Sequence, residues 1–175
     1  MKSFAFHISK NELHMDVPTT LIIGFGNPDR QDDGVAWHIL TRLAQDFGRP
    51  IPSMDEGFFP DGENPDLLFT LQLIPELAET ISAYQRVCFI DAHTGNVPED
   101  VNVVEVKAEY QRSPFTHHMT ADTCLSLVQT IYGKTLQAVL VSVRGYDFGF
   151  SHELSPVTQQ LAEQALARIT AWLAS

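Results

Sequence analysis

The chain has 175 residues, enough for one domain with a substantial buried core. With 44% hydrophobic and 19% charged residues, its composition is ordinary for a soluble globular protein. The formal charge of −11 argues against nucleic-acid binding, because phosphate recognition needs a basic face. No stretch approaches the roughly 20 apolar residues of a membrane helix, and residues 1–18 lack the apolar core of a signal peptide. We therefore expect a cytoplasmic protein without a membrane partner.

Predicted strands and helices alternate along the chain. Residues 1–18 are predicted to be an N-terminal extension, and a single domain is predicted over residues 19–175. The predicted strands are 20–25, 67–73, 86–91, 102–107 and 138–144, and the predicted helices are 35–47, 75–84, 120–132 and 155–172. Residues 50–65, with four prolines and two glycines, are predicted to be one long loop. This order predicts a three-layer α/β/α domain around a five-stranded sheet that is mostly parallel or mixed.

The most informative segment is the first predicted strand with the turn after it, residues 20–36. Gly24 and Gly26 allow a sharp turn, and such turns lie at the carboxyl ends of strands, where open α/β sheets bind ligands. Asp32 and Asp33 follow where a helix begins, and we expect them to project into the mouth of a cleft. Alternatively, Asp32 caps the helix and Asp33 interacts favourably with its positive N-terminus.

A phosphate-binding turn is another interpretation of this segment. Gly24-x-Gly26 matches the start of a dinucleotide fingerprint, but the position of the third glycine holds Asp29. The carboxylates of Asp32 and Asp33 would also repel a phosphate at the helix N-terminus. The segment therefore favours an acidic site over a nucleotide site.

A second acidic position, Asp91, is the last residue of the third predicted strand, on the same rim of the sheet as Asp33. Asp91 is either a site residue or an exposed acid in the next turn. The pair His117-His118 precedes the helix predicted from residue 120, and imidazole is a common metal ligand. Two carboxylates and one imidazole would form a metal site suited to zinc, nickel, cobalt or manganese.

The sequence contains no serine elbow (Gly-x-Ser-x-Gly) and no His-Glu-x-x-His zinc motif. Cys88 and Cys124 lie in apolar runs without Cys-x-x-Cys spacing, which predicts buried, reduced thiols. A hydrolase with this sequence would depend on a metal or on carboxylates, not on a covalent nucleophile.

Four ordered blocks of the chain resemble the hydrogenase maturation proteases, endopeptidases that trim the C-terminal extension from the large-subunit precursor of nickel–iron hydrogenases. The blocks are Gly-Phe-Gly-Asn to Asp-Asp-Gly-Val (24–35), Phe-Ile-Asp-Ala (89–92), Thr-His-His-Met-Thr (116–120), and Arg-Gly-Tyr-Asp-Phe to Leu-Ser-Pro (144–156). The resemblance covers about residues 20–174. The resemblance implies an aspartic-type endopeptidase whose partner is that precursor and which acts after nickel insertion.

The resemblance also implies a metal site made of Asp33, Asp91 and His117, in which the two aspartates serve as catalytic groups as well. His118 is adjacent to His117 and is an alternative ligand. Family members often carry Glu at the position of Asp33 and Gly at that of Ala36. The metal is expected to be nickel supplied by the precursor, with zinc or cadmium able to substitute in vitro. Which group activates water is left open.

Other functions fit the same residues. A non-catalytic module could sense or chaperone the metal-loaded precursor without cutting it, and a peptidase of the same fold could act on an unrelated substrate. No long apolar surface stripe demands a dimer, so we expect a monomer.

Overall fold

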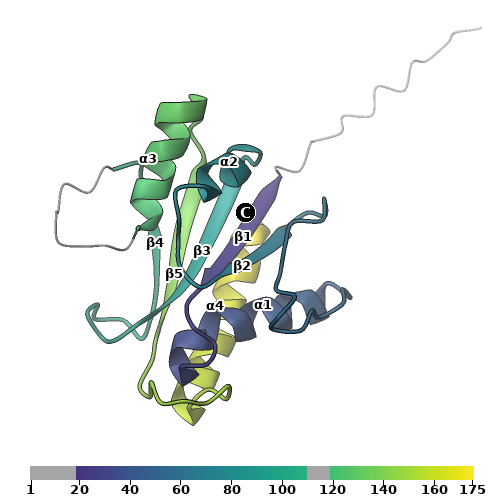
Figure 1. Cartoon of the computed structure of the whole chain (residues 1–175). Helices are drawn as coiled ribbons and strands as arrows, with labels where there is room; N and C mark the ends of the chain where they lie inside the picture. Colours follow the sequence, from purple (N-terminus) through teal and green to yellow (C-terminus); the bar gives the residue numbers. More distant parts are fainter. Residues whose placement is uncertain (1–18, 110–118) are drawn as a thin grey trace, which may run out of the picture.

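The computed structural model describes residues 19–109 and 119–175, which form a five-stranded mixed sheet with helices on both faces (Figure 1). The strands are β1 (Thr20–Phe25), β2 (Asp66–Thr70), β3 (Arg86–His93), β4 (Val101–Glu105) and β5 (Gln137–Arg144). The helices are α1 (Val35–Asp46), α2 (Leu77–Ser82), α3 (Ala121–Tyr132) and α4 (Pro156–Leu173), and a 3-10 turn, η1 (Gln31–Gly34), precedes α1. The α/β/α architecture predicted from the sequence is confirmed. The predicted N-terminal extension lies outside the described residues.

The strand order creates a switch point between β1 and β3. The order in the sheet is β2-β1-β3-β5-β4, in which β4 alone of these strands runs antiparallel to its neighbour. After β1 the chain moves to one side to form β2, and it then crosses back to form β3 on the other side of β1. Connections on opposite sides leave a crevice at the carboxyl ends of the two central strands, which is where open α/β sheets bind ligands.

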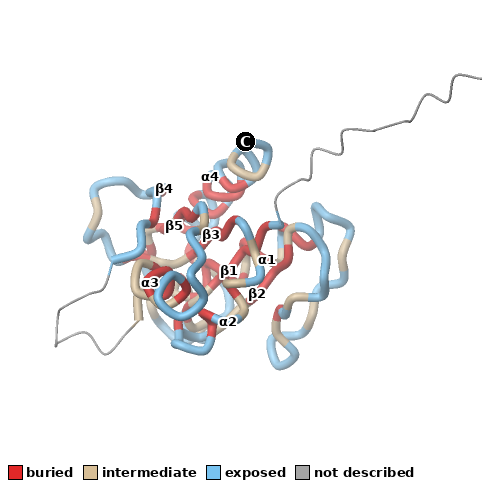
Figure 2. Tube along the Cα trace, turned by 90° about the horizontal axis from the view of Figure 1, so that it is seen from above, coloured by how far each residue is buried: buried red, intermediate tan, exposed pale blue. Residues whose placement is uncertain are grey.

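Each face of the sheet packs against its own pair of helices. Ile22, Cys88 and Ile90 face α1 and α4, whereas the alternate residues, such as Ile23 and Phe89, face α2 and α3. Figure 2 shows this burial along the central strands, with the exposed segments mainly in the loops. In the part of the chain that the structure describes, no helix is long and apolar enough to cross a membrane.

The two thiols are buried and unpaired, as the sequence predicted. Burial raises the pKa of Cys88 to about 12, an effect that the nearby Arg86 opposes, and burial also raises the pKa of Cys124 to about 12. Neither cysteine is therefore an activated nucleophile at neutral pH.

Local capping signals set the ends of α3 and α4. The Thr120 side chain accepts the N–H of Thr123 at the start of α3, and Gly133 ends that helix with a φ of 65°. Ser155 caps α4 in the same way, and Pro156 occupies the first helical position.

The long loop predicted over residues 50–65 contains no helix or strand. Its end is anchored by Asp66, which is 3% exposed at the amino end of β2. The Asp66 carboxylate accepts the backbone N–H groups of residues 61, 62 and 63, and the Tyr84 hydroxyl donates to it at 2.6 Å. This cluster lies at the amino ends of β1 and β2, whereas the β1–β3 crevice lies at the carboxyl ends of the strands.

Candidate active site

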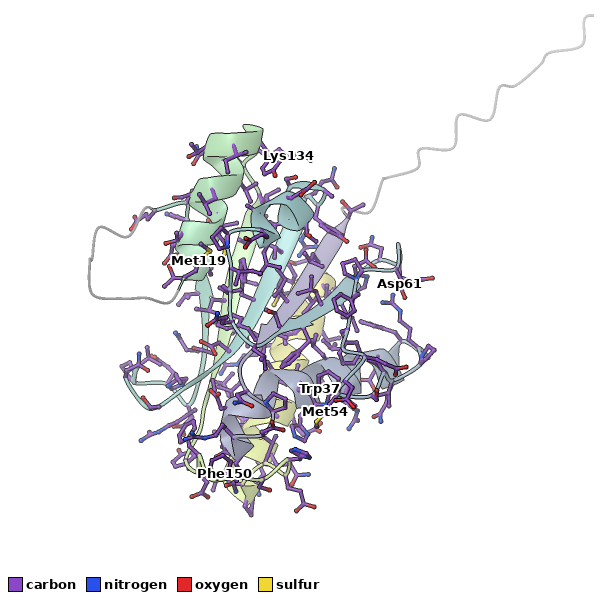
Figure 3. The ribbon with its side chains drawn as sticks, in the orientation of Figure 1. Trp37, Met54, Asp61, Met119, Lys134 and Phe150 are labelled. Atoms are coloured by element: carbon purple, nitrogen blue, oxygen red, sulfur yellow. The ribbon has the colours of Figure 1, made fainter. Side chains whose placement is uncertain are left out.

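A cleft of about 420 Å³ lies at the carboxyl ends of β1 and β3. Asp33 enters it from η1 and Asp91 from β3, and the walls include Leu71, Leu73 and Met119. Met119 lies just before the first turn of α3 (Figure 3). Two carboxylates that are 58 positions apart in the sequence thus share one cleft at the switch point of the sheet.

The turn after β1 holds Asp33 in this cleft. The Asp33 Oδ2 atom accepts the backbone N–H of Asn27 at 2.9 Å, so the side chain closes the turn that carries it. Gly26 has a φ of 135°, and a Cβ atom at this residue would lie 2.2 Å from the carbonyl oxygen of Asp33. Only glycine combines that backbone angle with such a close approach.

The other glycines of the segment also serve packing. A Cβ atom on Gly24 would lie 2.9 Å from Leu40 Cδ1 of α1, and one on Gly34 would lie 2.7 Å from Pro28 Cα. These close contacts explain why glycine occupies both positions, and no phosphate site is needed to explain them. The N–H of Asn27, which points into the turn, already bonds the Asp33 carboxylate.

Asp91 lies within β3, which continues to His93 instead of ending at residue 91 as predicted. Burial raises the pKa of Asp91 to about 7; a hydrogen bond from the Ala92 N–H opposes this rise, and the nearby Asp33 carboxylate adds to it. At neutral pH, Asp91 is therefore divided between its protonated and ionised forms. Such a perturbed acid beside a second acid in a cleft is typical of a functional site.

Asp32 does not project into the cleft, so this prediction is wrong. Its side chain is completely buried, with 0% exposure, and points to the start of α4. Its carboxylate accepts three backbone N–H groups and two hydroxyl groups, which belong to Tyr146, Asp147, Ser155 and Thr158. Burial raises the pKa of Asp32, but the hydrogen bonds from Asp147, Tyr146 and Ser155 together outweigh it and hold the pKa below its ordinary value.

The capping alternative for Asp32 is also wrong. The cap positions of η1 and α1 are Arg30 and Gly34, and neither makes a side-chain capping bond. Asp32 instead serves the N-terminus of a different helix, α4, which lies more than 120 residues later in the sequence.

The predicted imidazole ligand, His117, and its neighbour His118 lie outside the described residues. Among residues 19–109 and 119–175, no group of three or more His, Cys, Asp or Glu side chains is placed to hold a metal ion. The described part of the cleft supplies the Asp33 and Asp91 carboxylates, and Met119 and Thr120 line its wall directly after the two histidines.

His93 is a further buried residue near this rim of the sheet, and no sequence pattern indicated it. It is 7% exposed, its Nδ1 atom accepts the N–H of Gly95 at 3.1 Å, and its Nε2 atom has no hydrogen-bond partner in the described structure. By strand alternation it shares a sheet face with Asp91. The alternation of side chains along a strand could have indicated His93, but only if the third predicted strand had been extended to residue 93.

A second cavity, of about 490 Å³, lies between the loop at residues 50–61 and the end of α1. Its charged side chains are occupied by local contacts, since Arg49 donates to the Pro65 carbonyl and Glu56 accepts from Ser53. The third charged side chain of this cavity, Asp61, accepts the backbone N–H of Glu63 at 3.3 Å.

No family model matches this sequence, and a comparison with curated proteins finds no match. Solved structures do match. HycI, a NiFe hydrogenase maturation protease from Thermococcus kodakarensis KOD1, has a TM-score of 0.60 at 18% identity, covering 90% of this chain and 94% of its own. The hydrogenase maturating endopeptidase HybD from E. coli has a TM-score of 0.65 at 19% identity, covering 89% and 92%. The hydrogenase 2 maturation peptidase from a Thaumarchaeota archaeon has a TM-score of 0.59 at 18% identity, covering 89% and 98%. The chain therefore has the fold of the hydrogenase maturation proteases.

Proposed function

We propose that this chain is an endopeptidase that removes the C-terminal extension of a nickel–iron hydrogenase large-subunit precursor after nickel insertion. The observation that carries the proposal is the convergence of Asp33 and Asp91 on one cleft at the β1–β3 switch point. The proposal is supported by the shared fold, because the structural neighbours are named as hydrogenase maturation proteases.

The two carboxylates suit peptide hydrolysis without a covalent intermediate. Hydrolysis requires a group that takes a proton from the attacking water and a group that returns a proton to the leaving amine. Asp91, with a pKa of about 7, can hold or release a proton at neutral pH. With Asp33 in the same cleft, two carboxylates are present to divide these two tasks.

The same residues suit a divalent metal, which we propose to be nickel that arrives within the precursor as part of the substrate. Asp33 and Asp91 would bind it together with His117, or with His118 as the alternative. Burial beside a second carboxylate makes ionised Asp91 costly, and a cation between the two would relieve that cost. His117 precedes the cleft residue Met119 by two positions in the sequence. A metal bound there would polarise the scissile carbonyl or the attacking water.

The experiment is a defined mixture of purified chain and a nickel-loaded large-subunit precursor, followed by intact-mass spectrometry. We expect loss of the C-terminal extension, which slows by about 100-fold or more in Asp33→Asn and Asp91→Asn. Asp29→Asn is the matched control, because it makes the same change to an exposed acid of the same turn outside the cleft. Precursor that is bound but stays full length would favour a chaperone, and cleavage that survives both substitutions would contradict the proposed site.

A further inference from the structure

We propose that Asp32 is a positioning residue, which ties η1 to the start of α4 so that the adjacent Asp33 faces Asp91. Asp32 would touch neither substrate nor metal. The kinetic part of this inference rests on the proposed function, whereas its structural part does not.

The Asp32 carboxylate is the anchor of this turn and accepts five hydrogen bonds. Asp32 Oδ1 accepts the Ser155 N–H at 2.7 Å. Oδ2 accepts the N–H groups of Tyr146 and Asp147 at 2.8 and 2.9 Å, and the hydroxyls of Ser155 and Thr158 at 2.7 and 2.8 Å. The Asp32 N–H in turn donates to the Asp147 carbonyl at 3.0 Å. Both the side chain and the backbone of Asp32 thus bind the segment between β5 and α4.

The turn that carries Asp33 depends on such an external hold. η1 is a single 3-10 turn of four residues, and it has no side-chain cap of its own. Because a 3-10 turn advances about 120° per residue, adjacent side chains leave it in different directions. Asp32 therefore points to α4 while Asp33 points to the cleft. Fixing the first side chain fixes the direction of the second.

The chemistry of the anchor requires a carboxylate of this length. Backbone N–H groups, which can only donate, face both oxygens of the carboxylate. The amide nitrogen of an asparagine would therefore place N–H against N–H in either orientation. A Cβ atom on Gly145 would lie 2.9 Å from the Asp32 Cβ atom and 2.6 Å from the Phe148 ring. This close packing leaves no room for the longer glutamate side chain.

Asp66 provides a matched control for a merely structural carboxylate. It is 3% exposed, and it accepts three backbone N–H groups and the Tyr84 hydroxyl. It therefore resembles Asp32 in burial and in hydrogen bonding. Asp66 is the first residue of β2, at the end of the sheet away from the cleft. Asp66→Asn should therefore destabilise the fold without moving Asp33.

The structural readout is amide hydrogen exchange of the full chain. The N–H of Asn27 is bonded to Asp33 Oδ2, so its protection reports the position of that carboxylate. In Asp32→Asn we expect Asn27 to exchange about tenfold faster or more, relative to the amide of Ile22 in β1. Asp66→Asn should leave this ratio unchanged. Unchanged Asn27 protection in folded Asp32→Asn would overturn the inference, whether or not the chain cleaves a precursor.

The kinetic readout separates positioning from substrate binding. With the nickel-loaded precursor, Asp32→Asn should lower kcat by about tenfold or more while KM stays near the wild-type value, and Asp66→Asn should leave kcat unchanged. If the wild-type chain cleaves and Asp32→Asn retains its kcat, the inference fails and the proposed function stands. If the wild-type chain does not cleave, the proposed function fails and the exchange ratio still decides the inference.

A milder variant covers the case in which Asp32→Asn does not fold. Thr158→Val removes one of the five donors, the hydroxyl that Asp32 Oδ2 accepts at 2.8 Å, and leaves the carboxylate in place. A smaller rise in Asn27 exchange is expected from it, and wild-type exchange in this variant would then overturn the inference.

Discussion

Replacing Asp91 with asparagine should stabilise the protein at neutral and alkaline pH. The native structure holds this carboxyl group in a half-buried position near Asp33, where burial raises the pKa from its ordinary value of 3.8 to about 7. Asparagine has nearly the same shape, and its carbonyl oxygen can still accept the Ala92 N–H that Asp91 accepts at 2.8 Å. The substitution therefore removes the ionisation and keeps the packing.

The size and sign of the effect follow from linkage. A pKa rise from 3.8 to about 7 corresponds to about 4 kcal/mol, at about 1.4 kcal/mol for each pKa unit. Between these two pH values the native state binds more protons than the unfolded state, so the free energy of unfolding falls as pH rises. The cost of ionising Asp91 is absent below pH 3.8 and complete above pH 7. Asp91→Asn should therefore exceed the wild type in stability by up to about 4 kcal/mol at pH 8.

Urea denaturation at several pH values between 4 and 8 measures this difference. Asp33→Asn is the informative companion, because it removes only the part of the pKa rise that comes from the neighbouring carboxylate. The difference in the free energy of unfolding between Asp33→Asn and the wild type should therefore vary less with pH than the difference for Asp91→Asn. A constant difference in stability between Asp91→Asn and the wild type across this range, or a less stable Asp91→Asn at pH 8, would show that ionising Asp91 carries no cost in the folded state.

Two further predictions concern the turn and the thiols. Gly26→Ala should lower the free energy of unfolding by about 2 kcal/mol or more, because it combines a φ of 135° with a 2.2 Å approach to the Asp33 carbonyl oxygen. Gly62→Ala is the control, because Gly62 has a φ of 90° and a Cβ atom there would have no heavy atom within 4 Å. An equal loss of stability in both variants would show that the close approach at Gly26 adds nothing. Cys88 and Cys124 should not react with a thiol reagent in the native protein at pH 8, because burial raises both pKa values to about 12. Both should react in guanidinium chloride, and rapid labelling of the native protein would show that the thiols are accessible.

Local signals predicted much of the fold. The strand at Thr20–Phe25 has its predicted bounds, because an apolar run ends at glycines that the turn needs. The ends of α3 and the start of α4 were also predictable, because their capping residues bond to residues nearby in the sequence. These residues are Thr120, Gly133 and Ser155, with Pro156 in the first helical position. The end of β3 was predicted too early, because its last residues are held by pairing with the distant strand β5, up to His93 opposite Arg144.

The candidate site was predictable in type but not in detail. Parallel strands bring their carboxyl ends to one edge, so Asp33 and Asp91 could be expected on the same rim. The different directions of Asp32 and Asp33 could not be predicted, because they depend on Ser155 and Thr158, which lie more than 120 residues further along the chain. Adjacent carboxylates look equivalent in sequence until the position of α4 is known.

The most direct test of the proposed site is a crystal of this chain soaked with cadmium or nickel, with bound ions located by anomalous scattering. We expect an ion held jointly by Asp33 and Asp91, with His117 as the third protein ligand. An ion bound elsewhere, or no ion between these two carboxylates at saturating metal, would contradict the proposed site.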